Sequence, residues 1–407
     1  MVHIPPFEVT IWIEQLEDGC KYDLATTCAS SISLDELEEL SVDPATTSAM
    51  LSPRSLKLSY GPMRGSDRLR QNIAALYRSP TVTQESILTT NGGIVANQIV
   101  LQALLSADDH VVVMYPTYEQ LYQTPRMLGA EVTLWKLTPS SSPEDKWEWT
   151  LDLAFLRSAI KPNTKMLVLN SPNNPTGAHL SADMQKQILA IAAEHDLIVF
   201  CDEVFYPLFR MEDPPSSFLD LNYDKAIVIG SLSKAYSLAG TRTGWIASAN
   251  SELLDRCAAM RHYTTISVSQ IDEAIAAEAL ADRCRLPLLA RANRLATTNI
   301  HALETFVEEH RGRCSWSKPV AGTTAMLLFM RDGRPVDDKE FCLRLLRTTG
   351  VLLCPASVCF GDGKESADFR GFVRVGAAID TAEMAGALRE MRRFMAEGFA
   401  EVPLAPA

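Results

Sequence analysis

The residues best suited to chemistry lie in the segment Ser231-Leu-Ser-Lys234-Ala-Tyr-Ser-Leu-Ala-Gly-Thr-Arg242, which follows an apolar run. A lysine amine in an apolar pocket loses its proton readily and forms a Schiff base with an aldehyde. The Ser231 hydroxyl and the Arg242 guanidinium would then hold a dianionic phosphate on that aldehyde. A solvated lysine in a loop is the alternative interpretation, because short SxxK motifs recur by accident.

A carboxylate, Asp202, ends the apolar run Leu-Ile-Val-Phe-Cys-Asp. Burying a carboxylate after five apolar residues is costly unless it meets a cation. We therefore expect a cationic group of a ligand against Asp202, unless this side chain instead caps the next helix.

Two turn-forming segments complete the candidate set. Asn91-Gly-Gly-Ile94 stands between an expected strand and an expected helix, where its backbone amides could hold a phosphate at the helix N-terminus. Asn170-Ser-Pro-Asn-Asn174-Pro-Thr-Gly177 follows another apolar run, and its composition is also that of an ordinary turn. Each segment is weak evidence for a site when taken alone.

The elements that position these residues follow a strand-helix alternation. From about residue 85 onward, short apolar runs rich in β-branched residues alternate with longer segments of helical spacing, which is typical of a parallel sheet covered by helices. The sequence therefore predicts a doubly wound α/β domain. The predicted strands are Ile87 to Thr90, His110 to Tyr115, Glu131 to Leu137, Lys165 to Asn170, Leu197 to Asp202, Ala226 to Gly230 and Gly244 to Ala249.

The C-terminal third of the chain changes character. Ser269 to Asn299 and Asp337 to Thr349 have helical spacing, while Ala325 to Met330 and Phe372 to Gly376 have the composition of strands. We predict a large α/β domain over residues 52–290 and a smaller α+β domain formed by residues 1–51 and 291–407.

Composition narrows the class of protein. A net charge of -12 argues against nucleic acid or an anionic membrane as a partner. The nine cysteines form no CxxC pair and have no histidine at zinc spacing, so we expect free thiols and no metal site. No apolar run reaches the ~18 residues of a membrane span and no targeting segment is recognised, so we expect a cytoplasmic protein.

Taken in chain order, these segments resemble the class I/II aminotransferases, which are fold type I enzymes dependent on pyridoxal 5'-phosphate (PLP). The resemblance runs from about Tyr60 to Arg374, and an NPTG turn at Asn174 precedes the lysine motif by sixty residues. It implies a mostly parallel seven-stranded sheet domain and PLP bonded to Lys234. It also implies that Asn174 hydrogen-bonds the 3'-oxygen of PLP and that Asp202 keeps the ring nitrogen protonated, so that the ring acts as an electron sink.

The same resemblance assigns further roles. Arg374 would clamp the substrate α-carboxylate as a bidentate fork, with Asn174 and Thr27 also at the substrate. Tyr60 would reach the phosphate of the neighbouring subunit, which implies a homodimer with shared active sites. Catalysis would rest on Lys234, Asp202 and Tyr118. The other residues assigned to the cofactor are Ser231, Ser233, Arg242, Gly92, Gly93, Ile94, Tyr118, whose ring would stack on PLP, and Phe205.

Two departures from the family bear on the reaction. Phe205 replaces a tyrosine whose phenol donates to the 3'-oxygen of PLP, and Tyr206 should point to the opposite face because neighbours on a strand alternate. Losing that donor should keep the Schiff base protonated to higher pH. The segment from Leu24 to Ser33 replaces a glycine-rich, proline-containing stretch. In this segment the chain resembles enzymes of secondary metabolism such as capreomycidine synthase and fungal carbon-sulfur lyases.

Three functions follow from these observations. The leading hypothesis is an aminotransferase that acts on an amino acid and a 2-oxo acid, with Lys234 moving the proton. The alternative is elimination, replacement or cyclisation after the same proton removal, which Phe205 and residues 26–33 favour. A regulatory domain that binds PLP without turnover is the third possibility, because fold alone does not establish activity. Arg261 and His262 are the candidates for reading a substrate side-chain carboxylate.

Overall fold

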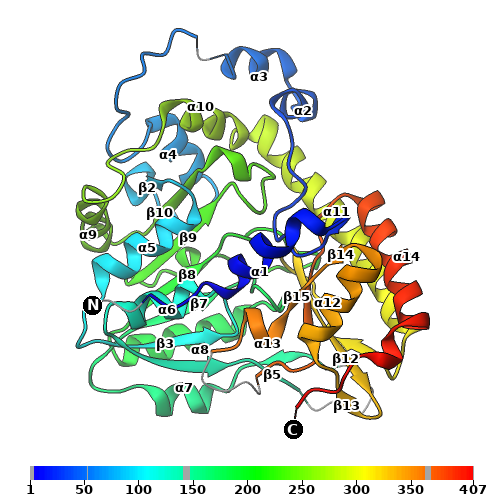
Figure 1. Ribbon diagram of the computed structural model, residues 1–407. Coiled ribbons are helices and arrows are strands. Elements are labelled where there is room, and N and C mark those ends of the chain that lie inside the picture. Colours follow the sequence, from blue (N-terminus) through cyan, green and yellow to red (C-terminus); the bar gives the residue numbers. More distant parts are fainter. Residues whose placement is uncertain (1–3, 53, 141–146, 363–367, 407) are drawn as a thin grey trace.

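The computed structural model describes residues 4–52, 54–140, 147–362 and 368–406, which form a larger and a smaller sheet with helices around them (Figure 1). The larger sheet has seven strands in the order β2-β10-β9-β8-β7-β3-β4, parallel except for β10. This confirms the α/β fold predicted from the sequence. The strands are β2 (Ile87–Thr90), β10 (Gly244–Ala247), β9 (Ala226–Ser231), β8 (Ile198–Asp202), β7 (Thr164–Asn170), β3 (His110–Tyr115) and β4 (Glu131–Lys136).

The central strands are mostly apolar because both faces of the sheet are covered. Successive side chains point to opposite faces, so Val111 and Val113 pack into one apolar cluster while Val112 and Met114 pack into the other. The first cluster contains residues of α5 (Gly93–Leu104), α6 (Gln120–Met127) and α9 (Ser251–Arg261). The second contains residues of α4 (Asp67–Ala74), α7 (Leu153–Ala159), α8 (Ala182–Glu194) and α10 (Gln270–Ala279).

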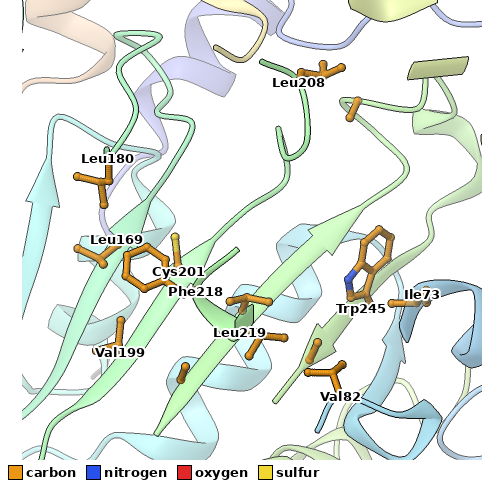
Figure 2. Packing of buried hydrophobic residues seen from close by; sticks show 14 of the residues in the cluster. Ile73, Val82, Leu169, Leu180, Val199, Cys201, Leu208, Phe218, Leu219 and Trp245 are labelled. Carbon is orange, nitrogen blue, oxygen red and sulfur yellow. The ribbon is translucent and has the colours of Figure 1, made fainter. Parts of the chain in front are cut away.

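Figure 2 shows the second cluster where the sheet meets its covering segments. Leu169, Val199 and Cys201 come from neighbouring strands, and Phe218 and Leu219 cover them from the segment between β8 and β9. These side chains are almost fully buried, so close packing of the apolar core holds in place the strands that end at the candidate site residues.

The smaller sheet is antiparallel, in the order β11-β12-β16-β15, with β13 beside β12. Its apolar cluster also takes in Val9, Trp12, Leu24 and Ala25 from the N-terminal segment. The elements are β11 (Cys314–Trp316), β12 (Thr324–Arg331), β13 (Arg334–Pro335), β15 (Cys354–Pro355), β16 (Phe372–Gly376), α12 (Asp338–Thr349), α13 (Ala356–Cys359), α14 (Thr381–Glu397) and α1 (Glu8–Leu16), with β1 (Tyr22–Asp23) pairing β14 (Val351–Leu352).

A long helix, α11 (Asp282–Glu309), joins the two parts. Its first half packs into the core of the large sheet through Leu288 and Ala292, and its second half packs into the small core through Leu303 and Phe306. α2 (Leu34–Leu40) and α3 (Pro44–Met50) lie beside α10 and α11 at the top of Figure 1. The sequence-based domain boundaries at residues 51 and 290 stay predictions.

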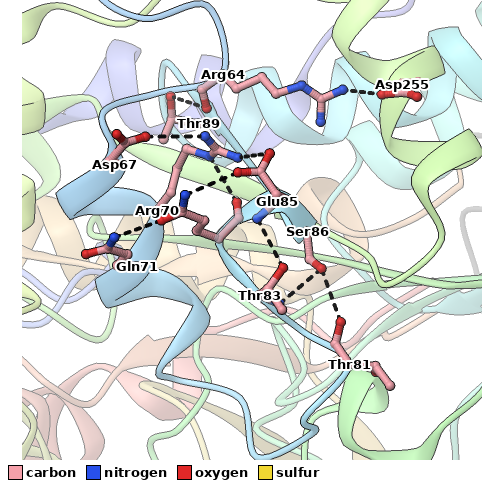
Figure 3. A network of polar contacts seen from close by, with 11 residues as sticks. Arg64, Asp67, Arg70, Gln71, Thr81, Thr83, Glu85, Ser86, Thr89 and Asp255 are labelled. Carbon is pink, nitrogen blue, oxygen red and sulfur yellow. Dashed lines mark hydrogen bonds and ion pairs between the residues drawn. The ribbon is translucent and has the colours of Figure 1, made fainter.

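A polar network anchors the segment that leads into β2 (Figure 3). Arg70 on α4 donates to the carbonyl of Gln84 at 3.0 Å and to Glu85 at 2.8 Å. Arg64 pairs with Asp255. These contacts fix the approach to β2, whose end carries the expected phosphate loop.

In the described ranges, no helix is both long and apolar enough to cross a membrane. The nine cysteines, all of which are described, are free thiols; seven are buried and Cys20 and Cys28 are half-buried.

Candidate active site

A cavity of about 330 Å³ lies where β7, β8 and β9 end at Asn170, Asp202 and Ser231. The carboxyl ends of parallel strands are the usual position of ligand sites in such sheets. The cavity brings together most of the residues predicted from the sequence. Those lining it are Lys234, Asp202, Asn174, Ser231, Ser233, Arg242, Gly93, Ile94, Tyr118, Phe205, Thr27 and Arg374.

Lys234 stands three residues beyond the end of β9 with its amine in the cavity. Its Nζ donates to Thr27 Oγ1 at 2.7 Å and lies 3.5 Å from Cys28 Sγ. Sequence reasoning placed Thr27 at the substrate and did not anticipate the contact with Cys28. The amine is therefore held toward the cavity rather than solvated in a loop.

Asp202 is a buried carboxylate that makes no ion pair with any described residue. Its two oxygens accept hydrogen bonds from Asn97 Nδ2 at 2.9 Å and from the Val204 amide at 3.1 Å. Burial raises the pKa of Asp202 to about 6, against these hydrogen bonds and the positive charge of Lys234, which lower it. A buried carboxylate without a paired cation suits the protonated ring nitrogen of a ligand.

Asn97 is a site residue that sequence reasoning missed. It lies one helical turn after Gly93, so both residues share the face of α5 that lines the cavity. That spacing is the signal that could have identified it.

The end of the cavity where the sequence predicts a phosphate is formed by the N-terminus of α5 and the loop after β9. Gly92 precedes the helix with φ 85°, and a Cβ on it would lie only 2.8 Å from Nη2 of Arg242. Ser231 Oγ lies 3.0 Å from Ser233 Oγ. Free helical amides, two hydroxyls and a guanidinium within one loop cluster match the donor set that a phosphate requires.

Arg374, on β16, supplies the opposite end of the cavity. It is only 2% exposed, its guanidinium carbon lies 5.1 Å from the centre of the Phe360 ring, and Nη1 donates to Asn174 Oδ1 at 3.1 Å. Nη2 donates to the carbonyl of Ala25 and lies 3.3 Å from Cys354 Sγ. Its Nε has no partner among the described residues, so the guanidinium retains donor capacity for a carboxylate.

Tyr118 and Phe205 form aromatic walls. The Tyr118 ring lies 5.2 Å from that of Phe7, and burial, with Asp202 nearby, raises the pKa of its phenol to about 12. Phe205 lines the cavity, whereas Tyr206 does not and instead contacts the Phe209 ring. Tyr206 is thus outside the cavity as predicted, but the reason given was wrong, because the chain turns after β8 ends at Asp202.

The N-terminal helix α1 forms a wall that sequence reasoning did not anticipate. Val9, Thr10 and Ile13 line the cavity. The buried carboxylate of Glu119, whose pKa burial raises to about 7, accepts from the Val9 amide at 3.3 Å. Because the two partners are 110 residues apart, no local sequence pattern signals this contact.

Four sequence candidates do not line this cavity: Gly92, which immediately precedes the lining residue Gly93, and Tyr60, Arg261 and His262. Tyr60 is 75% exposed and does not line it, so its predicted role toward a second subunit stays a prediction. Arg261 is buried and donates to the carbonyls of Thr89 and Ile266. Neither Arg261 nor His262 lines the cavity of this chain, so their suggested role toward a substrate carboxylate stays a prediction.

Comparisons with known proteins agree with this geometry. The family model for aminotransferase class I and II matches residues 41–395. Capreomycidine synthase of Streptomyces vinaceus is 29% identical over 360 residues, which is 87% of each chain. The structure of a PLP-dependent aminotransferase from Streptococcus suis has a TM-score of 0.85 and 34% identity, covering 96% of this chain and 98% of that one. The PLP-dependent cyclase OrfR, at 23% identity and a TM-score of 0.83 over 97% and 98%, shares the fold.

The chain therefore belongs to the class I and II aminotransferase family. It is an enzyme, and its cofactor is PLP. The cavity fits that cofactor. Asp202 offers a buried carboxylate that makes no ion pair within the described ranges and suits the ring nitrogen, the glycine turn leaves room at the helix N-terminus, and Lys234 offers the amine.

Proposed function

We propose that the protein is an aminotransferase that moves the α-amino group of an amino acid to a 2-oxo acid. The observation that carries this proposal is that Lys234, Arg374 and Asp202 line the same cavity. Lys234 is the only amine among the described residues that line it, and none of these residues is a histidine or a glutamate. Transamination needs one group that both takes and returns a proton, which a single lysine provides.

The chain's own residues divide the work. PLP supplies an aldehyde carbon and an aromatic ring that takes up electrons from the substrate α-carbon. Arg374 binds the α-carboxylate and so fixes the position of the α-carbon. Lys234 Nζ takes the proton from that carbon, and Asp202 holds the proton on the ring nitrogen. Asn174 orients Arg374, because its Oδ1 accepts a hydrogen bond from Nη1 of Arg374.

A spectral screen tests this proposal. Purified enzyme loaded with PLP is mixed with single amino acids, and then with single 2-oxo acids. We expect a subset of amino acids to remove the visible band of the cofactor and a 2-oxo acid to restore it. Failure of every 2-oxo acid to restore the band, with ammonia released instead, would contradict transamination.

A second candidate function is elimination, replacement or cyclisation of an amino acid with a leaving group on its side chain. Phe205 leaves the cavity without the expected phenol, and the Cys28 thiol beside Lys234 offers an additional acid for a leaving group. The similarity to capreomycidine synthase over 87% of each chain also supports this candidate. In the same screen it predicts consumption of β- or γ-substituted amino acids without any dependence on a 2-oxo acid.

We also propose a homodimer in the cytoplasm. Tyr60 and Tyr263, 75% and 89% exposed, lie on segments that pack together, because Gln270 donates to the carbonyls of Lys57 and Ser59. Clustered exposed apolar side chains are typical of an interface, and nine free thiols suit a reducing compartment. Sedimentation should give twice the chain mass. The other exposed apolar residues of these segments are Leu58, Met63, Ile266 and Ile271.

A further inference from the structure

The amine of Lys234 is held by two side chains from a distant part of the sequence. Thr27 Oγ1 accepts from Lys234 Nζ at 2.7 Å, and Cys28 Sγ lies 3.5 Å from the same nitrogen. Both residues belong to the segment between β1 and α2, more than 200 residues before the lysine. A lysine side chain has a flexible four-carbon stem, so an acceptor at this distance selects one direction for its amine.

The segment that carries Thr27 is fixed independently of the Thr27 hydroxyl. The carbonyl of Thr27 accepts from the buried hydroxyl of Thr323 at 2.6 Å, and the Ala29 amide donates to the carbonyl of Lys234 at 3.2 Å. In the described part of the chain, the Thr27 hydroxyl itself bonds only to Lys234. Thr27 is 9% exposed. Within the described ranges, this buried hydroxyl makes no hydrogen bond to the backbone and contacts the Lys234 amine. Its contribution is therefore expected at that amine.

We propose that Thr27 is a positioning residue for Lys234, with Cys28 as a weaker second acceptor. Its hydroxyl holds the Lys234 amine in the cavity whenever this amine is not bonded to the cofactor, both before PLP is captured and while Lys234 moves the α proton. The inference rests on the proposed function, because it takes Lys234 as the base. Restricting an amine to one orientation lowers the entropic part of the barrier to proton transfer.

Two substitutions separate the hydroxyl from the shape of the side chain. Thr27→Val keeps the branched shape and removes the acceptor, while Thr27→Ser keeps the acceptor and removes a methyl group. We expect Thr27→Val to lower kcat by roughly tenfold with KM changed by less than about twofold, which is the scale of one hydrogen bond. Thr27→Ser should stay within about threefold of the wild type, and Cys28→Ala should cost about twofold, because sulfur is a weak acceptor.

Two readouts report on Lys234 directly. With an α-deuterated amino acid, the primary isotope effect on kcat should rise in Thr27→Val, because proton transfer by a mispositioned amine becomes more limiting. When PLP is added to the apoenzyme, growth of the visible band reports bonding to Lys234. This growth should slow by about tenfold in Thr27→Val and not in Thr27→Ser, in line with the loss of one oriented hydrogen bond.

The outcomes distinguish the role of Thr27 from the proposed function on which it rests. An unchanged isotope effect and unchanged PLP capture in Thr27→Val would overturn the role of Thr27, provided that Lys234→Ala is inactive. Equal slowing in Thr27→Val and Thr27→Ser would also overturn it, because side-chain size would then set the rate. Turnover in Lys234→Ala would instead overturn the proposed function.

Discussion

Replacing Arg374 by lysine tests how the substrate carboxylate is held. Arg374 is nearly fully buried, is oriented by Asn174 and the carbonyl of Ala25, and has an Nε without a partner among the described residues. Lysine keeps the charge but replaces a planar fork by a point charge, so one of two charge-assisted hydrogen bonds to the carboxylate is lost. Such a bond contributes about 1.5–3 kcal/mol, which corresponds to a loss in kcat/KM of roughly 10- to 150-fold.

The assay uses an amino acid selected in the spectral screen and the matching amine that lacks the carboxylate. We expect Arg374→Lys to lower kcat/KM for the amino acid by the stated factor and to leave the much slower reaction of the amine within about threefold, since the amine makes no bond that the substitution removes. Retention of the visible band shows that the site is intact. An equal loss for both compounds would refute the carboxylate role, as would no loss for either.

Two further predictions concern protons. Phe205→Tyr supplies a phenol where Phe205 lines the cavity. The midpoint for titration of the visible band should then fall by about one pH unit, which is the scale of one hydrogen bond. An unchanged or higher midpoint would count against this account. Burial raises the pKa of the Glu203 carboxyl to about 8, so the folded state keeps a proton that the unfolded chain has lost above its ordinary pKa of 4.5. The free energy of unfolding should therefore fall as pH rises from about 4.5 to 8, by up to about 5 kcal/mol. Glu203→Gln should flatten this fall in denaturant titrations, and parallel curves for the two proteins would contradict the assignment.

The sequence predicted the strands of the large sheet well because most of them are buried on both faces and consist mainly of apolar residues. β3, predicted as His110 to Tyr115, has those bounds in the structure. The antiparallel direction of β10 was not predicted, since an apolar run is the same in either direction. Ser269 to Asn299 was predicted as one helix and is two, α10 and α11, because the apolar spacing continues across the break and no glycine marks it.

Some residues of the candidate site could likewise be predicted from the sequence, and others could not. Residues that end strands, such as Asp202 and Ser231, could be found from local motifs, because the end of a strand fixes their place. Partners that meet through tertiary packing could not. The approach of Cys28 to Lys234 and of Val9 to Glu119 depends on how the N-terminal segment crosses the cavity. A cysteine or a valine at these positions gives no sequence signal for such a contact.

Lys234→Ala tests the central claim most directly. After borohydride reduction, mass spectrometry of the wild-type enzyme should place the cofactor on the peptide containing Lys234. The variant should carry PLP only non-covalently, and turnover should fall by roughly 10³-fold, the scale expected on losing a general base. Retained turnover, or PLP reduced onto a different lysine in the wild type, would contradict the account.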